Sequence, residues 1–446
     1  MKILIAGAGE VGFHVAKILA QEEHDIILID KEQERLNYVE SHIDVGTIRG
    51  NSVSIKLLED AGVANADLLI AATSSEETNI TTAIIGKHLG AKRTIVRISN
   101  PEFQIEKEKI DMANLGIDNM VFPEDLAASE IIRLVKRTGL TDAFEFGGGR
   151  LLLTGMILEA GAQLDRVNMI EAVQINPRVK FTVVAIQRAG KTIIPRGDTV
   201  FNAGDHIYFI SRPECVDEMM SMAGKAHEKI KNIMILGGSL IARLFTKQMQ
   251  SKFNIRLIDK DKEKCFLLAE ELPEALVVCG DGSQVDMLEE EGITEMDAFI
   301  ALTNDSETNI ISCLVAKNHG VKSAIALVEN IDYISLSQNI GIDTLINKKM
   351  IAINNIFRHV RQGQVVSLTS LHGVDSEVLE FEVHNNCRVA NVPIKKLSFP
   401  REAIIAGVIR GEESFIAGGD TFIEEGDRVV VFTLPGAVHK VEEFFK

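Results

Sequence analysis

Long apolar segments and paired cysteines are both missing from this sequence of 446 residues. Its apolar runs, such as residues 403–409, are much shorter than the ~20 residues that a membrane-spanning helix needs. The apolar run near the N-terminus is too short for the core of a signal peptide, and no cleavage site follows it. The five cysteines are widely spaced with no C-x-x-C pair, which argues against a disulfide framework and a cysteine zinc site. We therefore expect a cytoplasmic protein.

Basic residues are outnumbered, with 47 against 64 acidic residues, so the formal net charge is −17. A surface of that sign repels phosphate backbones unless a local basic patch offsets it. The nearest candidate, Lys348-Lys349, is only a pair. We therefore expect no nucleic-acid partner.

Catalytic motifs are also absent. The 11 histidines show no zinc-binding spacing, and the chain has no G-x-S-x-G elbow and no P-loop lysine. Four aspartates lie beside glycines and are interpreted as turn residues: Asp198, Asp205, Asp420 and Asp427. The sequence therefore predicts binding without catalysis: the chain is not expected to be an enzyme, and no metal site is predicted.

The chain repeats itself at two offsets. Residues 66–80 and 296–310 are related by a shift of 230 positions and share the pattern D-x-x-I-A-x-T-x-x-x-E-T-N-I. Residues 197–199 and 419–421 both read Gly-Asp-Thr and are related by a shift of 222. Two different offsets indicate two kinds of module, each present twice, in the order N1–C1–N2–C2.

The repeats predict the domain boundaries. We expect N1 over 1–120, a linker helix over 121–138, C1 over 139–224, N2 over 231–348, a second linker helix over 349–366, and C2 over 367–446. The length fits several domains, because it exceeds what one hydrophobic core usually holds.

The N modules have an α/β rhythm. Short apolar strands are expected at 2–6, 25–30, 68–72 and 94–98, with helices between them, including 32–39 and 78–89. This alternation predicts a Rossmann-like parallel sheet in each N module. The C modules have strands such as 181–187 and 206–210 joined by Gly/Asp turns, so each is expected to be a small α+β domain. The fold class is therefore α/β.

A glycine-rich loop follows the first strand and precedes a helix. It contains Gly7, Ala8, Gly9, Glu10, Val11 and Gly12, in the pattern G-x-G-x-x-G. Such a loop brings backbone N–H groups and a helix N-terminus to a pyrophosphate, and Asp30 stands where a carboxylate binds ribose hydroxyls. The alternative is a glycine turn needed only for packing, with Asp30 a solvated strand end. An acidic residue at this position disfavours NADP but does not separate NAD(H) from ATP, ADP or AMP.

The corresponding loop of N2 is degenerate. It carries Gly237, but Ser239 and Ala242 replace the second and third glycines, while Asp259 retains the carboxylate. A Ser at the second position places a Cβ where the pyrophosphate should pass. Both a second nucleotide site and a decayed, structural copy remain open.

Other candidate contacts follow neighbouring strands of the predicted sheet. Parallel sheets place ligands at the carboxyl ends of their strands. The candidates there are Gly50, Asn51, Thr73, Ser74, Asn79 and Arg97, with Thr303 as the counterpart of Thr73 in N2. Thr73 and Asn79 are equally interpretable as helix caps, and Arg97 either reaches a phosphate or forms a surface ion pair.

The loop GAGEVG, the strand-ending Asp30, the segment IAATSSEETNI and the phrase PRGDTVFNAGDHI resemble the regulator-of-K⁺-conductance modules RCK-N and RCK-C. Two such pairs in one chain are similar to the peripheral subunits of Trk-type potassium uptake systems. The resemblance covers essentially the whole chain and implies NAD contacts at Gly7, Gly9, Gly12, Asp30, Thr73 and Arg97. Asn51 departs from the family, which usually has an aspartate there.

The resemblance also implies a regulatory mechanism. Four chains would form a ring of eight N modules beneath an integral-membrane potassium-translocating subunit of the TrkH or TrkG type, and the nucleotide would set the shape of the ring and thereby ion flux. The alternatives are an NAD-dependent oxidoreductase and a ligand-sensing subunit of another cation transporter.

Overall fold

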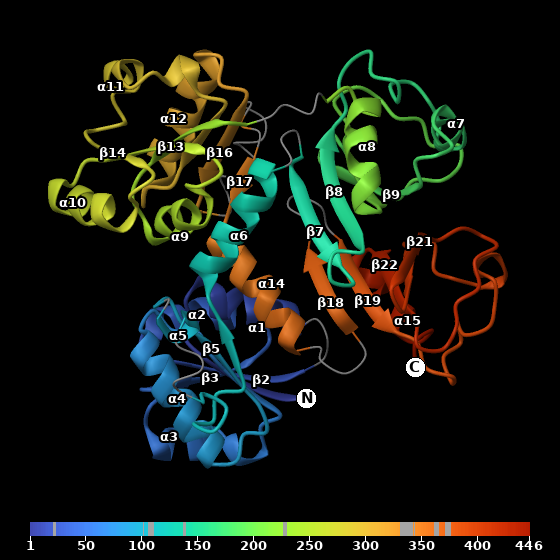
Figure 1. Cartoon of the computed structure of the whole chain (residues 1–446). Coiled ribbons are helices and arrows are strands. Elements are labelled where there is room, and N and C mark those ends of the chain that lie inside the picture. Colours follow the sequence, from blue (N-terminus) through green and yellow to red (C-terminus); the bar gives the residue numbers. More distant parts are fainter. Residues whose placement is uncertain are drawn as a thin grey trace. The chain divides into compact units, whose positions relative to one another are not determined.

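The computed structural model describes residues 1–20, 24–100, 102–105, 111–136, 140–225, 230–330, 342, 344–360, 365–370 and 376–446 (Figure 1). The chain forms two compact units. Unit 1 contains Met1–Ala127 and Asn347–Val360, and unit 2 contains Ala128–Ile346 and Arg361–Lys446. Within the described part of the chain, no helix combines the length and apolar character needed to cross a membrane.

Unit 1 is built on a six-stranded parallel sheet with the strand order β3-β2-β1-β4-β5-β6 (Figure 1). The strands are β1 (Lys2–Ala6), β2 (Asp25–Asp30), β3 (Gly46–Arg49), β4 (Leu68–Ala71), β5 (Thr94–Arg97) and β6 (Asn119–Val121). The helices that follow them are α1 (Glu10–Ala20), α2 (Gln33–His42), α3 (Ile55–Asp60), α4 (Glu76–His88), α5 (Glu102–Ile105) and α6 (Pro123–Lys136). Every residue of β4 is fully buried, as expected of a strand covered on both faces.

Unit 2 contains a second parallel sheet with the corresponding order β14-β13-β12-β15-β16-β17. The strands are β12 (Asn232–Leu236), β13 (Asn254–Asp259), β14 (Leu276–Cys279), β15 (Ala298–Ala301), β16 (Ser323–Leu327) and β17 (Thr344–Ile346). The helices are α9 (Leu240–Met249), α10 (Lys262–Glu271), α11 (Val285–Glu290) and α12 (Ser306–Asn318). β1 and β12 begin 230 positions apart, so the repeat in sequence is a repeat in structure.

Each C module is an antiparallel five-stranded sheet in unit 2, in the order β10-β9-β11-β8-β7 or β18-β19-β22-β20-β21. The first sheet has β7 (Asp142–Phe146), β8 (Leu151–Ile157), β9 (Phe181–Arg188), β10 (Lys191–Ile193) and β11 (His206–Ser211), with α7 (Met169–Ile175) and α8 (Val216–Met222). The second has β18 (Val365–Ser370), β19 (Glu377–Glu382), β20 (Ala403–Arg410), β21 (Glu413–Ile416) and β22 (Arg428–Thr433), with α15 (Val438–Glu442). The predicted class, two Rossmann-like sheets alternating with two α+β domains, is confirmed.

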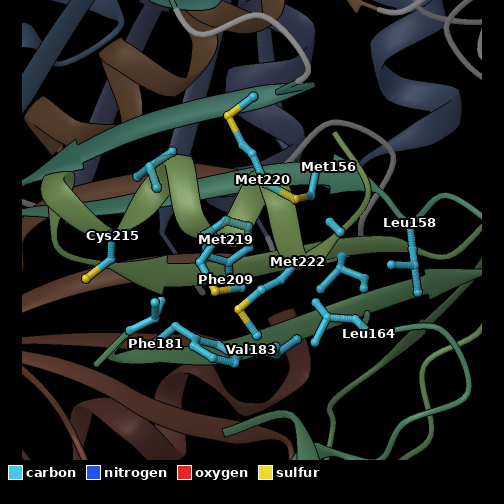
Figure 2. Close-up of a cluster of buried hydrophobic side chains, with 14 of the residues drawn as sticks. Met156, Leu158, Leu164, Phe181, Val183, Phe209, Cys215, Met219, Met220 and Met222 are labelled. Carbon is cyan, nitrogen blue, oxygen red and sulfur yellow. The ribbon is translucent and has the colours of Figure 1, made fainter. Parts of the chain in front are cut away.

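Methionines form the packing face of α8 in C1. Met219, Met220 and Met222 are all buried, and Met219 and Met222 point toward Val183 of β9 and Phe209 of β11 (Figure 2). Unbranched thioether side chains fill such irregular gaps well. Helix α8 therefore packs on one face of the C1 sheet, in a core to which α7 contributes Ala172.

The other faces of the two C sheets pack together inside unit 2. Their shared core contains Leu151 and Tyr208 from C1, and Val378 and Phe432 from C2, all fully buried. A Cβ at Gly407 of C2 would lie 2.5 Å from Leu151 Cδ1, so the approach is close.

Helix α14 (Lys348–Val360) belongs to unit 1, although it follows β17 of unit 2 directly in the sequence. It packs on α1 of N1. The first predicted linker helix corresponds to α6, whose residues are divided between the two units after Ala127. Residues 137–139 and 361–364, where we expected the linker helices to lead into the C modules, lie outside the described residues.

Helix ends differ from the predictions for local reasons. The helix expected over 78–89 begins at Glu76, because the Ser75 hydroxyl accepts a hydrogen bond from Thr78 N at 3.1 Å and caps it. The helix expected over 32–39 corresponds to α2, which runs from Gln33 to His42.

Candidate functional site

A cavity of about 290 Å³ lies in N1 where the strands of its sheet end. The predicted site residues that line it are Gly7, Gly9, Glu10, Val11, Asp30, Gly50, Thr73, Ser74 and Arg97. The lining does not include Ala8, Gly12, Asn51 and Asn79. Sequence reasoning missed several lining residues: Ile29, Lys31, Glu32, Arg35, Ser52, Ala72, Ser75, Thr78 and Lys349.

The three loop glycines have different physical reasons. Gly7 has a φ of +107°, and a Cβ there would lie 2.9 Å from Thr73 N. A Cβ at Gly12 would lie 1.8 Å from Gly7 O, so α1 can start close to the loop only with glycine at this position. A Cβ at Gly9 would meet nothing closer than Arg35 Nη1 at 3.8 Å. Gly7 and Gly12 thus shape the loop, and Gly9 keeps space open in the cavity.

Asp30 is the last residue of β2, and its carboxylate binds the backbone of the glycine loop. Its Oδ2 accepts a hydrogen bond from Ala8 N at 2.6 Å, and its Oδ1 accepts one from Glu32 N at 2.9 Å. Its side chain is only 10% exposed, so the alternative of a solvated strand end is wrong. An ionised carboxylate has about four acceptor positions, which leaves room for further donors from a ligand.

Asn79 acts as a buried tie beside the cavity. Its Oδ1 accepts hydrogen bonds from Thr73 N at 2.8 Å and Thr73 Oγ1 at 2.6 Å, and its Nδ2 donates to Thr73 O and to Arg97 O. Because Ser75 is the helix N-cap, the interpretation of Thr73 and Asn79 as caps is wrong. The same tie joins Thr303 and Asn309 in N2, so it serves the fold of both copies.

Positive charge distinguishes the N1 cavity. Four cationic residues line it, Lys31, Arg35, Arg97 and Lys349, against three carboxylates, Glu10, Asp30 and Glu32. Arg35 had a sequence signal: a basic residue stands five positions after the strand-ending aspartate in both halves, as Arg35 and Lys264. Lys349 had no such signal, since it is 339 positions from its partner Glu10.

The N2 cavity, of about 490 Å³, has the opposite balance. Gly237, Ser239, Asp259 and Thr303 line it as predicted. Among its lining residues, two are cationic, Lys260 and Lys264, and four are carboxylates, Asp259, Asp261, Asp281 and Asp305. A phosphate is therefore less well accommodated in N2 than in N1.

Asp259 is already engaged by its own domain. Lys264 Nζ lies 2.7 Å from its Oδ2, and Gly238 N donates to the same oxygen at 2.7 Å. Burial raises the pKa of Asp259, but the hydrogen bonds from Lys264, Asp261 N and Gly238 N outweigh it and lower the pKa overall. The ribose carboxylate of N2 is thus held by an internal ammonium group.

The N2 loop also differs in shape. Ala242 is fully buried, yet a Cβ at the corresponding Gly12 would lie 1.8 Å from the loop carbonyl. The N2 loop therefore cannot follow the path of the N1 loop. Ser239 caps α9 there, where its hydroxyl accepts a hydrogen bond from Ala242 N. Among the described residues of both modules, no group of His, Cys, Asp or Glu is arranged to hold a metal ion.

Comparison with known proteins identifies the family of this chain. The TrkA-N domain model matches residues 3–123 and 233–348, and the TrkA-C domain model matches residues 168–224 and 378–446. The chain belongs to the TrkA family. It is 35% identical to the Trk system potassium uptake protein TrkA homolog of Archaeoglobus fulgidus over the full length of both chains. It is also 35% identical to the Trk system potassium uptake protein TrkA of Haemophilus influenzae, covering 97% of this chain and 95% of that one.

The fold has solved relatives as well. The chain is similar to the GsuK channel bound to NAD, with a TM-score of 0.61 and 16% identity over 99% of this chain and 78% of that one. TrkA family members are regulatory subunits of transport and not enzymes, so the oxidoreductase alternative is set aside. This chain is a TrkA-like regulatory subunit of Trk potassium uptake with tandem TrkA-N and TrkA-C domains.

Proposed function

We propose that this TrkA-like chain senses NAD(H) or an adenine nucleotide, ATP or ADP, in its N1 cavity. It transmits the occupancy to an integral-membrane potassium-translocating subunit of the TrkH or TrkG type. In this proposal it lies at the cytoplasmic face of the membrane, held there by its partner. The observation that carries the proposal is the N1 cavity itself, which combines an open glycine loop, a carboxylate and an excess of cations.

The proposed roles follow from these contacts. Gly7, Gly9 and the N-terminus of α1 receive the pyrophosphate, since an 11-residue helix presents free N–H groups and partial positive charge there. Asp30 receives the ribose hydroxyls. Arg97 is directed to a phosphate, and Asn79 fixes its strand end through Arg97 O at 3.0 Å.

We propose N1 as the occupied site and N2 as the copy that has lost affinity. The internal Lys264–Asp259 pair, the changed loop and the excess of carboxylates support this assignment. Gly237, Ser239, Asp259 and Thr303 are then remnants of the ancestral site.

The proposed signal is a change in the shape of a tetrameric ring. Moving a two-state equilibrium from 1:99 to 99:1 requires about 5.5 kcal/mol. Four equivalent N1 sites that each favour one state by about 1.4 kcal/mol supply that difference. One charged hydrogen bond, at about 1.5–3 kcal/mol, is of sufficient size at each site.

Calorimetric titration of the full chain with NAD, NADH, ATP and ADP tests the site. We expect one site per chain for at least one of these ligands. Asp30→Asn should weaken binding about tenfold through the lost charged hydrogen bonds, whereas the matched variant Asp259→Asn should leave the affinity unchanged. Two sites per chain, or equal losses in both variants, would contradict the assignment to N1.

The transport role has its own test. A strain without the gene should take up potassium poorly at low external potassium, and the wild-type gene should restore uptake. If the Asp30→Asn gene restored potassium uptake although its product does not bind nucleotide, the chain would be needed for uptake as a structural subunit and not as a nucleotide sensor.

A further inference from the structure

One cationic residue of the N1 cavity comes from the far end of the sequence. Lys349 is the second residue of α14, and it lines the same cavity as Asp30 and Gly9. Its position is fixed by Asn347, a fully buried residue whose Oδ1 accepts hydrogen bonds from Lys349 N at 3.0 Å and Met350 N at 2.9 Å. The helix start is therefore anchored, and the lysine side chain is delivered to a defined place.

The other end of α14 is anchored as well. Arg93 donates from Nη1 to His359 O at 3.1 Å and from Nη2 to Val360 O at 3.2 Å. A guanidinium at the last carbonyls also complements the negative end of the helix dipole. Between these ends, Ile353 and Ile356 are fully buried, so the helix is packed into unit 1 along its length.

Glu10 is the partner of Lys349. Lys349 Nζ lies 2.7 Å from Glu10 Oε2, and the two side chains are 21% and 55% exposed. Glu10 is the first residue of α1 and lines the cavity at the helix end that faces the glycine loop. A carboxylate there opposes an incoming phosphate, whereas the ammonium beside it attracts one.

We propose that Lys349 is a phosphate-binding residue of the N1 site, where its ammonium leaves the Glu10 carboxylate for a phosphate oxygen of the bound nucleotide. This inference rests on the function proposed above. It predicts that the preference of the site for phosphorylated ligands depends on a residue that lies outside the N1 module in the sequence.

The position of α14 gives this exchange a regulatory meaning. Only Asn347 separates α14, of which Lys349 is the second residue, from β17, the edge strand of the N2 sheet. A nucleotide bound in N1 therefore acts directly on the helix that continues the second N module. Through Lys349, binding of a nucleotide in N1 is transmitted to the second half of the chain.

The repeat supports an assignment to N1 alone. β6 ends at Val121 and β17 at Ile346, which aligns Lys349 with Glu124 of the first half. The corresponding residue is thus an acid, and no residue of α6 is among those that line the N2 cavity. At this position of the helix, α14 carries a lysine and α6 carries a glutamate.

Nucleotide binding by a matched pair of variants tests the proposal. Lys349→Met removes the ammonium, and Lys348→Met removes the neighbouring lysine, which faces Glu124 at 4.0 Å and is not part of the cavity lining. Titration with adenosine, AMP, ADP, ATP and NAD separates charge from shape. We expect Lys349→Met to lower the affinity for at least one phosphorylated ligand about tenfold or more. The affinity for adenosine should not change, and Lys348→Met should bind all ligands as the wild type does.

Two further variants separate a charge effect from a folding defect. Lys349→Arg should retain binding. Glu10→Gln should raise the affinity for phosphorylated ligands in the wild-type background. The same change should raise it less in the Lys349→Met background, since the two residues are coupled. Equal behaviour of Lys349→Met and Lys348→Met, or an equal loss for adenosine and ATP, would overturn the role of Lys349. Absence of all binding in the wild-type chain would instead remove the proposed function.

Discussion

The absence of a Cβ atom at Gly9 leaves space in the glycine loop of N1. A Cβ at Gly9 has only Arg35 Nη1 near it, at 3.8 Å, so it meets the protein at ordinary contact distance. The N2 copy carries Ser239 at this position, and that serine caps α9. The second position of the loop therefore carries no side chain in N1 and carries the cap of the following helix in N2.

Replacing Gly9 with the residue of the second copy tests that statement. Gly9→Ser should keep the thermal melting temperature of the chain, because the new atoms find space. It should weaken nucleotide binding by about 1–3 kcal/mol, the cost of crowding a fitted site. Calorimetric titration and a thermal melt measure the two effects, and a fall in melting temperature with binding preserved would show that Gly9 is structural.

Gly12 provides the opposite case. Its Cβ would lie 1.8 Å from Gly7 O, which is backbone and has no way to rotate aside. Gly12→Ala should therefore destabilise the chain by about 1–3 kcal/mol, measured by urea unfolding. The reverse change in N2, Ala242→Gly, is the control, and it should not perturb N1 ligand binding.

At the scale of elements, an arginine in each C module binds the aspartate of the turn that precedes a neighbouring strand. Arg188 Nε donates to Asp205 Oδ1 at 2.7 Å and Arg188 Nη2 to Asp205 Oδ2 at 2.6 Å, while Arg410 and Asp427 repeat the pair 222 positions later. The hydrogen bonds that Arg188 donates to Asp205 raise the pKa of Arg188. Both aspartates close the turn that precedes a strand, as the sequence predicts, and their pairing with Arg188 and Arg410 explains why they are buried.

The coupling of this pair is measurable. Asp205 is 2% exposed, whereas the Arg188 side chain is 35% exposed, so solvent screens part of the attraction. We expect Asp205→Asn to cost about 1–3 kcal/mol. The double variant with Arg188→Met should cost less than the sum of the single variants. Urea unfolding of the four proteins completes the cycle, and additive losses would show that the two residues act independently.

The repeat is also why so much of the fold was predictable. Buried strands and turn glycines are local patterns, and they recur at 230 and 222 positions in two independent copies, so the four sheets followed from the sequence. The roles of Asn79 and Asp205 did not follow, because each depends on partners brought together by folding. In the same way, the sequence indicated the loop, Asp30 and Arg97 but not the other basic residues of the cavity, Lys31, Arg35 and Lys349.

At the scale of the whole molecule, α14 belongs to a different unit from the segments that precede and follow it in the sequence. The helix lies 318 residues after Asp30, yet it is part of unit 1 with N1. No periodicity or motif announces such an exchange, since it is decided by packing between distant segments. The Lys348-Lys349 pair, interpreted only as an insufficient basic patch, contributes one residue to the N1 cavity.

Hydrogen exchange tests this membership in the intact chain. A ligand present at 100 times its dissociation constant stabilises the conformation that binds it by about 2.7 kcal/mol. Because α1 and α14 belong to one unit, nucleotide should slow amide exchange in residues 348–360 together with residues 10–20. Asp30→Asn should abolish both effects at the same ligand concentration. Slowing confined to α1, with α14 unchanged, would mean that α14 opens independently of N1 and that occupancy of the cavity is not communicated to the second half of the chain.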